Sequence, residues 1–204
     1  MATLYSYALT NLQDVRENLG LDSGNTSNDN LIIRQINRIT DLLESYTGRR
    51  FKLTEYDNVE YDAPGIDQLI LNQRPITSFD SLEVRDNTLN EDNWETVDSN
   101  LYFVDTSAGV IDLNFNATGR WNRYRVSYTA GYDTIPADLA EAAAMIAAYY
   151  VTNPTGNVNV IEKQEGGRRI RYGTGLTGLQ NLFQQLGVDG TIDSYCNYPV
   201  LADK

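Results

Sequence analysis

The chain has 204 residues, of which 41% are hydrophobic and 22% are charged, values typical of a protein that buries one core or two small ones. Its 16 lysines and arginines stand against 28 aspartates and glutamates, so the formal net charge at pH 7 is −12. This acidic excess argues against a surface that grips nucleic acid phosphates or anionic lipid, but not against a surface that DNA slides past without binding.

The N-terminal part of the chain predicts two helices. The first covers about residues 11–19, with Thr10 as its expected cap and Gly20 as its expected stop. The second covers about residues 28–46 and ends at Gly48. Along the second helix, apolar residues recur at spacings of four and three: Ile32, Ile36, Ile39, Leu43 and Tyr46. This stripe predicts packing in a core, and a subunit interface is the alternative interpretation.

Between about residues 51 and 132 the sequence alternates between apolar and polar residues, as half-buried strands do. The alternation is clearest over the segments 69–71, 82–84, 110–115 and 123–128. Closely spaced turn signals separate these segments, which predicts an inserted antiparallel sheet of about six strands. Pro75 is expected at a strand end, because proline cannot donate to a ladder. The acidic stretch 87–100 matches no pattern.

Three elements and a tail are predicted in the C-terminal part. An alanine-rich helix over about residues 137–150 is expected to pack closely against the second helix. Residues 158–172 form a candidate hairpin with a two-residue glycine turn at 166–167. A last helix covers about residues 177–187, and residues 188–204 lack any period, which predicts an extended tail.

These elements together predict an α+β fold. Residues 1–50 and 133–187 would form a small helical bundle that carries the hairpin as an arm. Residues 51–132 would form a β-rich domain inserted into that bundle, and the tail would follow it.

The composition disfavours catalysis. The chain has no histidine, the side chain most used for acid–base work near neutral pH, and its single cysteine, Cys196, lies in the predicted tail. Acidic pairs such as Asp57 with Glu60 are numerous, but nothing in the sequence selects two of them as a catalytic pair. We therefore expect no enzyme activity, no metal and no cofactor. No apolar run approaches the roughly 20 residues of a membrane helix.

One basic segment stands out against the acidic background. Arg168, Arg169 and Arg171 lie in the second strand of the predicted hairpin, with Tyr172 beside them. Three interpretations remain open: a solvated hairpin, an arm that docks on an acidic neighbouring protein, and a contact with nucleic acid.

Two other classes of function remain open on the residues alone. A β-rich binding module, of the baseplate or carbohydrate-binding type, would use Trp94, Trp121 and tyrosines as a flat sugar-binding surface. A carboxylate-based hydrolase would need a cleft that holds one acid with a raised pKa.

An ordered series of short segments carries a resemblance over about residues 10–152. Its main members are Glu44-Ser-Tyr46-Thr-Gly48-Arg49-Arg50-Phe51, Arg74-Pro75-Ile76, Tyr102-Phe-Val-Asp105, Ala108-Gly109-Val-Ile111, Val126-Ser-Tyr128-Thr-Ala-Gly131-Tyr132 and Ile135-Pro136-Ala-Asp138-Leu139. In this order, the segments make the chain similar to phage head–tail connector (adaptor) proteins. The predicted hairpin and last helix resemble that family's C-terminal arm in kind.

The resemblance implies a structural virion protein, assembled in the bacterial cytoplasm, that forms a ring of usually twelve subunits at the head–tail interface. Such a ring docks under the portal protein and extends the DNA channel. It also offers a docking surface to a stopper, tail-completion or tail terminator protein. Genomic DNA would pass through the ring without specific binding, and no membrane is involved.

The resemblance also suggests interface residues. Twelve copies would carry about −144 formal charges, so the interfaces need local neutralisation. The helix group, expected to pair with acids of the adjacent subunit, consists of Arg34, Arg38, Arg49 and Arg50. The hairpin group, expected to reach a portal or stopper subunit, consists of Arg168, Arg169, Arg171 and Tyr172.

Overall fold

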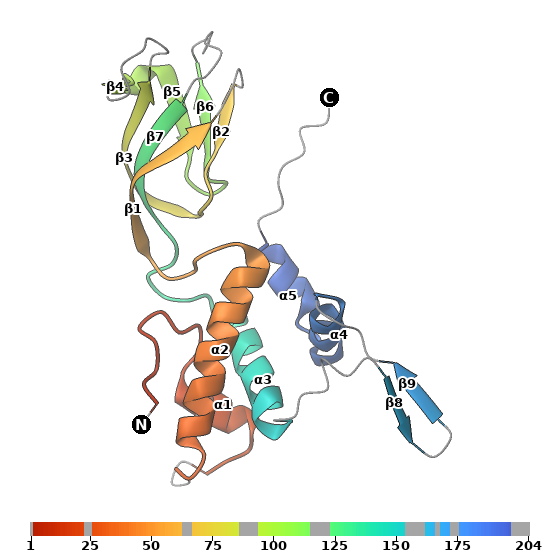
Figure 1. Cartoon of the computed structure of the whole chain (residues 1–204). Helices are drawn as coiled ribbons and strands as arrows, with labels where there is room; N and C mark the ends of the chain where they lie inside the picture. The colour runs from red at the N-terminus through yellow and green to blue at the C-terminus, as the bar shows by residue number, and fades with distance from the viewer. Residues whose placement is uncertain are drawn as a thin grey trace. The chain divides into compact units, whose positions relative to one another are not determined.

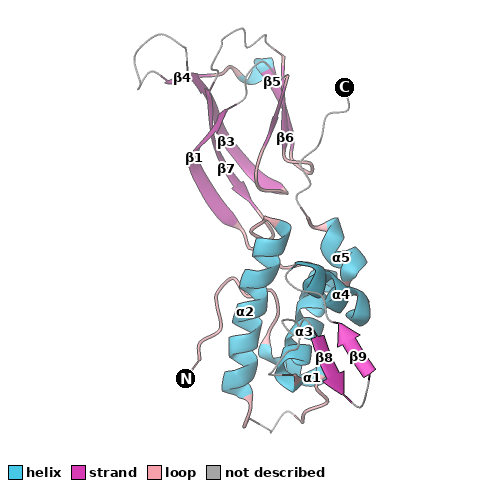
Figure 2. Ribbon diagram, turned by 45° about the vertical axis from the view of Figure 1, so that its right-hand side comes forward, coloured by secondary structure: helices cyan, strands magenta, loops and turns pink. Residues whose placement is uncertain are grey.

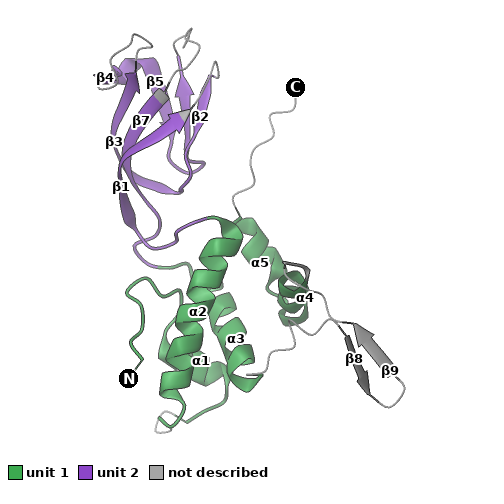
Figure 3. Cartoon of the chain, viewed as in Figure 1, with its two compact units in different colours: residues 1–48, 135–204 green, residues 49–134 purple. Residues whose placement is uncertain are grey.

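The structure is a computed structural model (Figure 1) that describes residues 2–22, 26–62, 67–85, 94–114, 123–153, 162–165, 168–171 and 176–196. Its helices and antiparallel sheets confirm the predicted α+β class. The chain divides into two compact units (Figure 3). Unit 1 comprises residues 1–48 and 135–204, and unit 2 comprises residues 49–134.

Unit 1 is built from helices (Figure 2). In chain order these are α1 (Leu12–Asn18), α2 (Asp29–Thr47), α3 (Ala137–Thr152), α4 (Leu176–Leu186) and α5 (Asp189–Ser194). The long helices α2 and α3 lie side by side, and α1 packs against both of them. The last two helices contact each other and α3.

The ends of α1 and α2 follow their sequence signals, with one correction. The cap of α1 is Asn11, whose side chain accepts from Asp14 N–H at 3.0 Å, and not the predicted Thr10. Gly20 ends α1 as predicted, because its positive φ of 64° lets Leu21 N–H bond to Arg16 O at 3.0 Å. The predicted stop of α2 at Gly48 is also confirmed.

The contact between α2 and α3 forms the core of unit 1. The predicted apolar stripe of α2 is buried at Ile32, Ile36, Ile39 and Leu43, while Tyr46 is half-buried. Most of the buried residues of α3 are alanines, and such small side chains let helices approach closely. The prediction that these helices pack on each other is confirmed.

The predicted extended tail is wrong over its first part, where the chain forms α5. Ile192 is fully buried, and Tyr195 Oη donates to Asp138 Oδ1 of α3 at 2.9 Å. A helix of six residues is too short for a hydrophobic period and too short to be stable alone, so packing against α3 stabilises it. Residues 197–204 lie outside the described residues.

Unit 2 contains seven described strands in two antiparallel sheets, and not the single sheet of about six strands that we predicted. The four-stranded sheet has the order β1-β7-β3-β4, with bounds Thr54–Asp62, Arg123–Ala130, Ile76–Arg85 and Trp94–Thr96. The three-stranded sheet has the order β2-β6-β5, with bounds Gln68–Ile70, Val110–Leu113 and Tyr102–Asp105. The short helix η1 (Ser99–Leu101) precedes β5. Pro75 directly precedes β3, as predicted.

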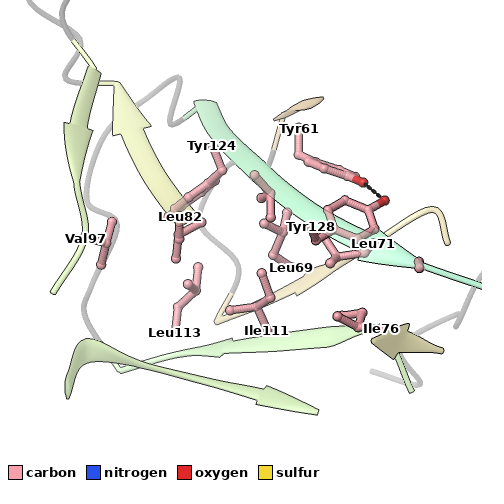
Figure 4. Close-up of a cluster of buried hydrophobic side chains, with 12 residues drawn as sticks. Tyr61, Leu69, Leu71, Ile76, Leu82, Val97, Ile111, Leu113, Tyr124 and Tyr128 are labelled. Carbon is pink, nitrogen blue, oxygen red and sulfur yellow. Dashed lines mark hydrogen bonds between the residues drawn. The ribbon is translucent and has the colours of Figure 1, made fainter. Parts of the chain in front are cut away.

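The core of unit 2 lies between its two sheets (Figure 4). The four-stranded sheet contributes Leu82, Tyr124, Val126 and Tyr128, and the other sheet contributes Leu69, Ile111 and Leu113. Their alternation with outward residues confirms the predicted strand pattern. The sequence could not separate one sheet from two, because strands in either arrangement bury every second side chain.

A tyrosine pair stabilises this core. The hydroxyl groups of Tyr61 and Tyr128 are hydrogen-bonded at 3.0 Å (Figure 4), and the Tyr128 ring stacks on Tyr56 with its centroid 5.2 Å away. Burial, reinforced by the bond to Tyr61, raises the pKa of Tyr128 well above its ordinary value. The phenol therefore stays protonated in the folded unit.

The two chain segments that enter and leave unit 2 bond to each other. Leu53 N–H donates to Tyr132 O at 3.1 Å, and Tyr132 N–H donates to Phe51 O at 2.7 Å. Gly131 lies beside this crossing with a φ of +109°, and a Cβ on it would lie 2.8 Å from the carbonyl oxygens of Phe51 and Lys52. Only glycine fits so close an approach in this conformation.

The C-terminal part contains a further antiparallel strand pair, β8 (Glu162–Glu165) and β9 (Arg168–Arg171), within the segment predicted as a hairpin. Their register places Glu165 opposite Arg168 and Lys163 opposite Ile170. The turn residues 166–167 lie outside the described residues. The role of this pair as an arm remains a prediction.

We expect Gly131→Ala to destabilise unit 2 by about 2–4 kcal/mol, because the new methyl group meets backbone oxygens that cannot move away. Denaturant unfolding followed by tryptophan fluorescence reports on unit 2, since both tryptophans lie within it. Gly187→Ala is the matched control, and its unfolding is followed by circular dichroism. Gly187 also has a positive φ, +71°, but a Cβ on it would have no atom within 4 Å among the described residues. This substitution should cost only about 1–2 kcal/mol. Equal losses would contradict the steric role of the crossing.

We expect unit 2 to lose stability above about pH 10, where the unfolded but not the folded Tyr128 ionises. Below that pH both states are protonated, so this tyrosine contributes no pH dependence. Tyr128→Phe should lower the slope of the unfolding free energy above pH 10 by up to about 1.4 kcal/mol per pH unit. The measurement is urea unfolding of the full chain between pH 8 and 11. An unchanged slope would show that the Tyr128 hydroxyl ionises equally in both states.

Candidate interaction surfaces

A polar face of α2 binds the N-terminal segment of the chain. Asn37 makes two of the bonds: its Oδ1 accepts from Tyr5 N–H at 3.0 Å and its Nδ2 donates to Thr3 O at 2.8 Å. The other bonds join Ala2 N–H to Asn30 Oδ1, Leu9 N–H to Thr40 Oγ1 and Tyr7 Oη to Asp41 Oδ1. This arrangement was not predicted from the sequence. Its only sequence signal is the spacing of Asn30, Asn37 and Asp41 at seven and four residues.

Arg34 and Arg38 lie on an exposed stripe of α2. Arg34 Nε donates to the carbonyl oxygen of Asn30 within its own helix at 3.3 Å. The guanidinium carbon of Arg38 lies 4.9 Å from the centre of the Tyr150 ring on α3. Burial raises the pKa of Tyr150, and the positive charge of Arg38 offsets part of that rise. Both arginines are therefore placed where a neighbouring molecule could meet them.

Arg49 and Arg50 are in different environments, although they are neighbours in the sequence. Arg49 is only 4% exposed, and its Nη2 donates to the carbonyl oxygen of Arg74. Its guanidinium carbon also lies 5.7 Å from the centre of the Phe51 ring, so this side chain is used inside unit 2. Arg50 is exposed, and its backbone N–H donates to Gln73 Oε1 at 2.8 Å. Burial thus removes Arg49 from the candidate surface, and Arg50 remains on it.

The hairpin group is only partly described. The backbone of Arg168, Arg169 and Arg171 forms β9, whereas Tyr172 lies outside the described residues. The register places Glu165 opposite Arg168 and Glu162 opposite Arg171, so two of the three arginines have an acidic residue as their cross-strand neighbour. The strand pair as a whole has a smaller positive charge than β9 alone.

Three exposed apolar side chains that were not predicted from the sequence form a discontinuous patch on the three-stranded sheet of unit 2. Phe103 of β5 is 64% exposed and Ile70 of β2 is 44% exposed, while Leu101, which directly precedes β5, is 43% exposed. Leu69 and Ile111 of the same sheet point into the core. The signal was the run of apolar residues at 101–104, in which alternation must turn every second side chain outward.

Two carboxylates lie among these apolar side chains. Asp112 lies opposite Phe103 in the ladder and accepts from Gln68 Nε2 at 2.7 Å. Asp105 accepts from the backbone N–H of Ala108 and from the hydroxyl and N–H of Ser107, and these bonds lower the pKa of Asp105. No lysine or arginine lies on β2, β5 or β6. This face of the sheet therefore combines exposed apolar side chains with carboxylates, and Asp112 lies on the central strand between β5 and β2.

The described residues provide little support for the two other classes of function. The guanidinium carbon of Arg125 lies 4.6 Å from the centre of the Trp94 ring, and Arg125 Nε donates to Glu83 Oε2 at 2.6 Å. One face of Trp94 is thus occupied, and Trp121 lies outside the described residues. Within the described ranges no cluster of acids or cysteine could hold a metal, and no helix is suited to crossing a bilayer.

Comparison with known proteins supplies a family and a shared fold. The model of a family described as head completion protein matches residues 8–177. Among solved structures, a chain from "Neck of empty GTA particle computed with C6 symmetry" is 18% identical with a TM-score of 0.54. A chain from "Virion of native gene transfer agent (GTA) particle" is 16% identical with a TM-score of 0.53. Both matches cover 98% of this chain and 96% of the other. No curated protein matched.

We expect Asn37→Ala to loosen the N-terminal segment without unfolding unit 1, because it removes two bonds worth about 0.5–1.5 kcal/mol each. Hydrogen–deuterium exchange should show the amide of Tyr5 exchanging at least about tenfold faster. Arg34→Ala, on the exposed stripe of the same helix, is the control and should leave this amide unchanged. Unchanged exchange in Asn37→Ala would show that other contacts hold the segment.

Proposed function

Because the chain belongs to the head completion protein family, we propose that it is a structural subunit of the head–tail connector of a phage-like virion. In this role it forms a ring at the neck, below the portal protein. The ring extends the DNA channel and offers its lower surface to a stopper, tail-completion or tail terminator protein. The role is structural and not catalytic.

The family match over residues 8–177 is the observation that carries this proposal, since it spans most of both units. The solved structures support it through the shared fold, and they come from a particle neck and a virion. The resemblance in the sequence, built from segments over about residues 10–152, leads to the same family of connector proteins.

The charge of the chain suits a channel for DNA. A ring of twelve copies would carry about −144 formal charges, so phosphates would be repelled from its walls and DNA could pass without binding. The same charge opposes assembly, because each subunit approaches a neighbour of the same sign. Ring formation therefore needs attractive contacts that are placed locally at the interfaces.

Three exposed arginines supply such contacts in this proposal: Arg34 and Arg38 of α2, and Arg50 at the start of unit 2. Each would pair with a carboxylate of the adjacent subunit. The hairpin group (Arg168, Arg169, Arg171 and Tyr172) would reach a portal or stopper subunit, or a neighbouring copy of the chain. Surface ion pairs are individually worth about 0–1 kcal/mol, so these contacts give orientation, while apolar burial supplies most of the affinity.

We expect electron microscopy of the full chain, alone and co-expressed with a portal protein, to show a closed ring stacked on the portal, with about twelve copies around the axis. The double variant Arg34→Glu/Arg38→Glu should reduce the fraction of subunits in rings at least about tenfold, because it places two more acids at an acidic interface. Mass photometry on the same samples gives that fraction.

The control is Arg85→Glu in a strand of unit 2, which changes the charge by −2, half the change of the double variant, and is therefore compared with each single variant, Arg34→Glu and Arg38→Glu. It should leave the ring fraction unchanged. A chain that stays monomeric with and without portal would contradict the connector role. Rings that tolerate the double variant would contradict only the part assigned to α2.

A further inference from the structure

Among the described strands, β5 of the three-stranded sheet has a hydrogen-bonded partner strand on one side only, and it carries the most exposed large apolar side chain of the described residues. The strand order β2-β6-β5 makes β5 an edge strand, and Phe103 lies at its centre with 64% of its surface exposed. Such an edge presents peptide groups that can pair with another strand. We propose that this edge binds β9 of a second copy of the chain, an inference that rests on the ring assembly proposed above.

The hydrogen-bond pattern of the sheet determines which groups of β5 are available. Asn114 N–H donates to Leu101 O at 2.8 Å, so these two residues form a hydrogen-bonded pair. In an antiparallel ladder, every second pair of opposed residues is hydrogen-bonded. Phe103 and Asp105 therefore direct their peptide groups toward β6. The peptide groups of Tyr102 and Val104 point in the opposite direction, away from β6. Just beyond β5, Thr106 O already accepts from Ile76 N–H of β3 at 2.7 Å, so the edge available to a partner strand is limited to β5 itself.

The pairing of β8 with β9 leads to a complementary pattern. Glu165 and Arg168 are cross-strand partners, and only two residues separate them in the sequence. In a hairpin with a two-residue turn, the pair of residues that flanks the turn is hydrogen-bonded. Alternation then directs the peptide groups of Arg168 and Ile170 toward β8. Those of Arg169 and Arg171 point to the free side of β9, so each strand has two residues with outward-pointing peptide groups at the same spacing.

A single antiparallel register joins these groups. It places Tyr102 opposite Arg171 and Val104 opposite Arg169, which are the residues with outward peptide groups on the two strands. The same register places Ile170 opposite Phe103, two apolar residues, and Arg168 opposite Asp105, a cation and a carboxylate. No shift of one residue reproduces these matches, because it would place the outward peptide groups of one strand opposite inward groups of the other.

The positive charge of β9 makes it a better partner for the edge strand β5 than most other segments of the chain. The patch has carboxylates at Asp105 and Asp112, and none of its three strands carries a lysine or arginine. The lowered pKa of Asp105 keeps this carboxylate ionised. A partner strand must therefore be basic and must offer an apolar side chain, and the sequence Arg168-Arg-Ile-Arg171 meets both requirements.

The contact joins two different surfaces, β9 on one copy and β5 on the next. Each copy therefore donates one strand and receives another. Head-to-tail contacts of this kind generate a ring when the rotation between neighbours closes. The strand contact would supply backbone pairing and apolar burial that the arginines of α2 cannot provide.

The test is a disulfide between copies. In the full chain with Cys196→Ser, the double variant Phe103→Cys/Ile170→Cys places two thiols in a directly opposed pair, within disulfide distance. We expect mild oxidation of assembled rings to give a ladder of multiples of the chain mass on a non-reducing gel. The cross-linked fraction should be at least about tenfold above that of Ile70→Cys/Ile170→Cys, whose thiol lies two strands away on β2.

The outcomes separate the two proposals when electron microscopy is run on the same samples. Rings without a ladder, or with an equal ladder in the control pair, overturn the β9–β5 contact and leave the connector role intact. A cross-link confined to single chains overturns the assignment to a second copy. The absence of rings with and without portal contradicts the connector role, and the strand contact with it.

Discussion

The packing of α2 against α3 is the contact on which the rest of the structure depends. These helices belong to one bundle, yet 86 residues of unit 2 are inserted between them in the sequence. An insert at such a place must return the chain to where it left. The bonds of Tyr132 to Phe51 and Leu53 provide that return, and Gly131 lets the two backbones approach closely enough to form them.

Unit 2 differs from unit 1 in how completely it covers its apolar residues. One face of each of its sheets is buried, as the alternation of its strands requires. The other face of the three-stranded sheet exposes Phe103 and Ile70. Exposing these apolar side chains to water does not stabilise a monomer. Apolar exposure of this kind is typical of a protein that functions in an assembly, where a neighbour removes the patch from water.

Charge and apolar surface have opposite effects in such an assembly. The net charge of −12 keeps free copies apart and keeps DNA phosphates from binding. Assembly must then rely on a few positions where cations or apolar side chains meet a complementary surface. Surfaces of this kind among the described residues include the exposed arginines of α2, Arg50, the basic strand β9 and the patch around Phe103.

Features that depend on residues close together in the chain could be predicted from the sequence. The stripe of α2, the alanine face of α3, the stop at Gly20 and the strand alternation around Tyr124 and Ile111 were all predictable, because local periodicity and backbone conformation control them. The tertiary structure alone decided the division into two sheets, the formation of α5, the burial of Arg49 and the binding of the N-terminal segment to Asn37. Each of these features depends on contacts between residues far apart in the chain. Such contacts produce no periodic pattern of apolar residues in the sequence, so they could not be predicted from it.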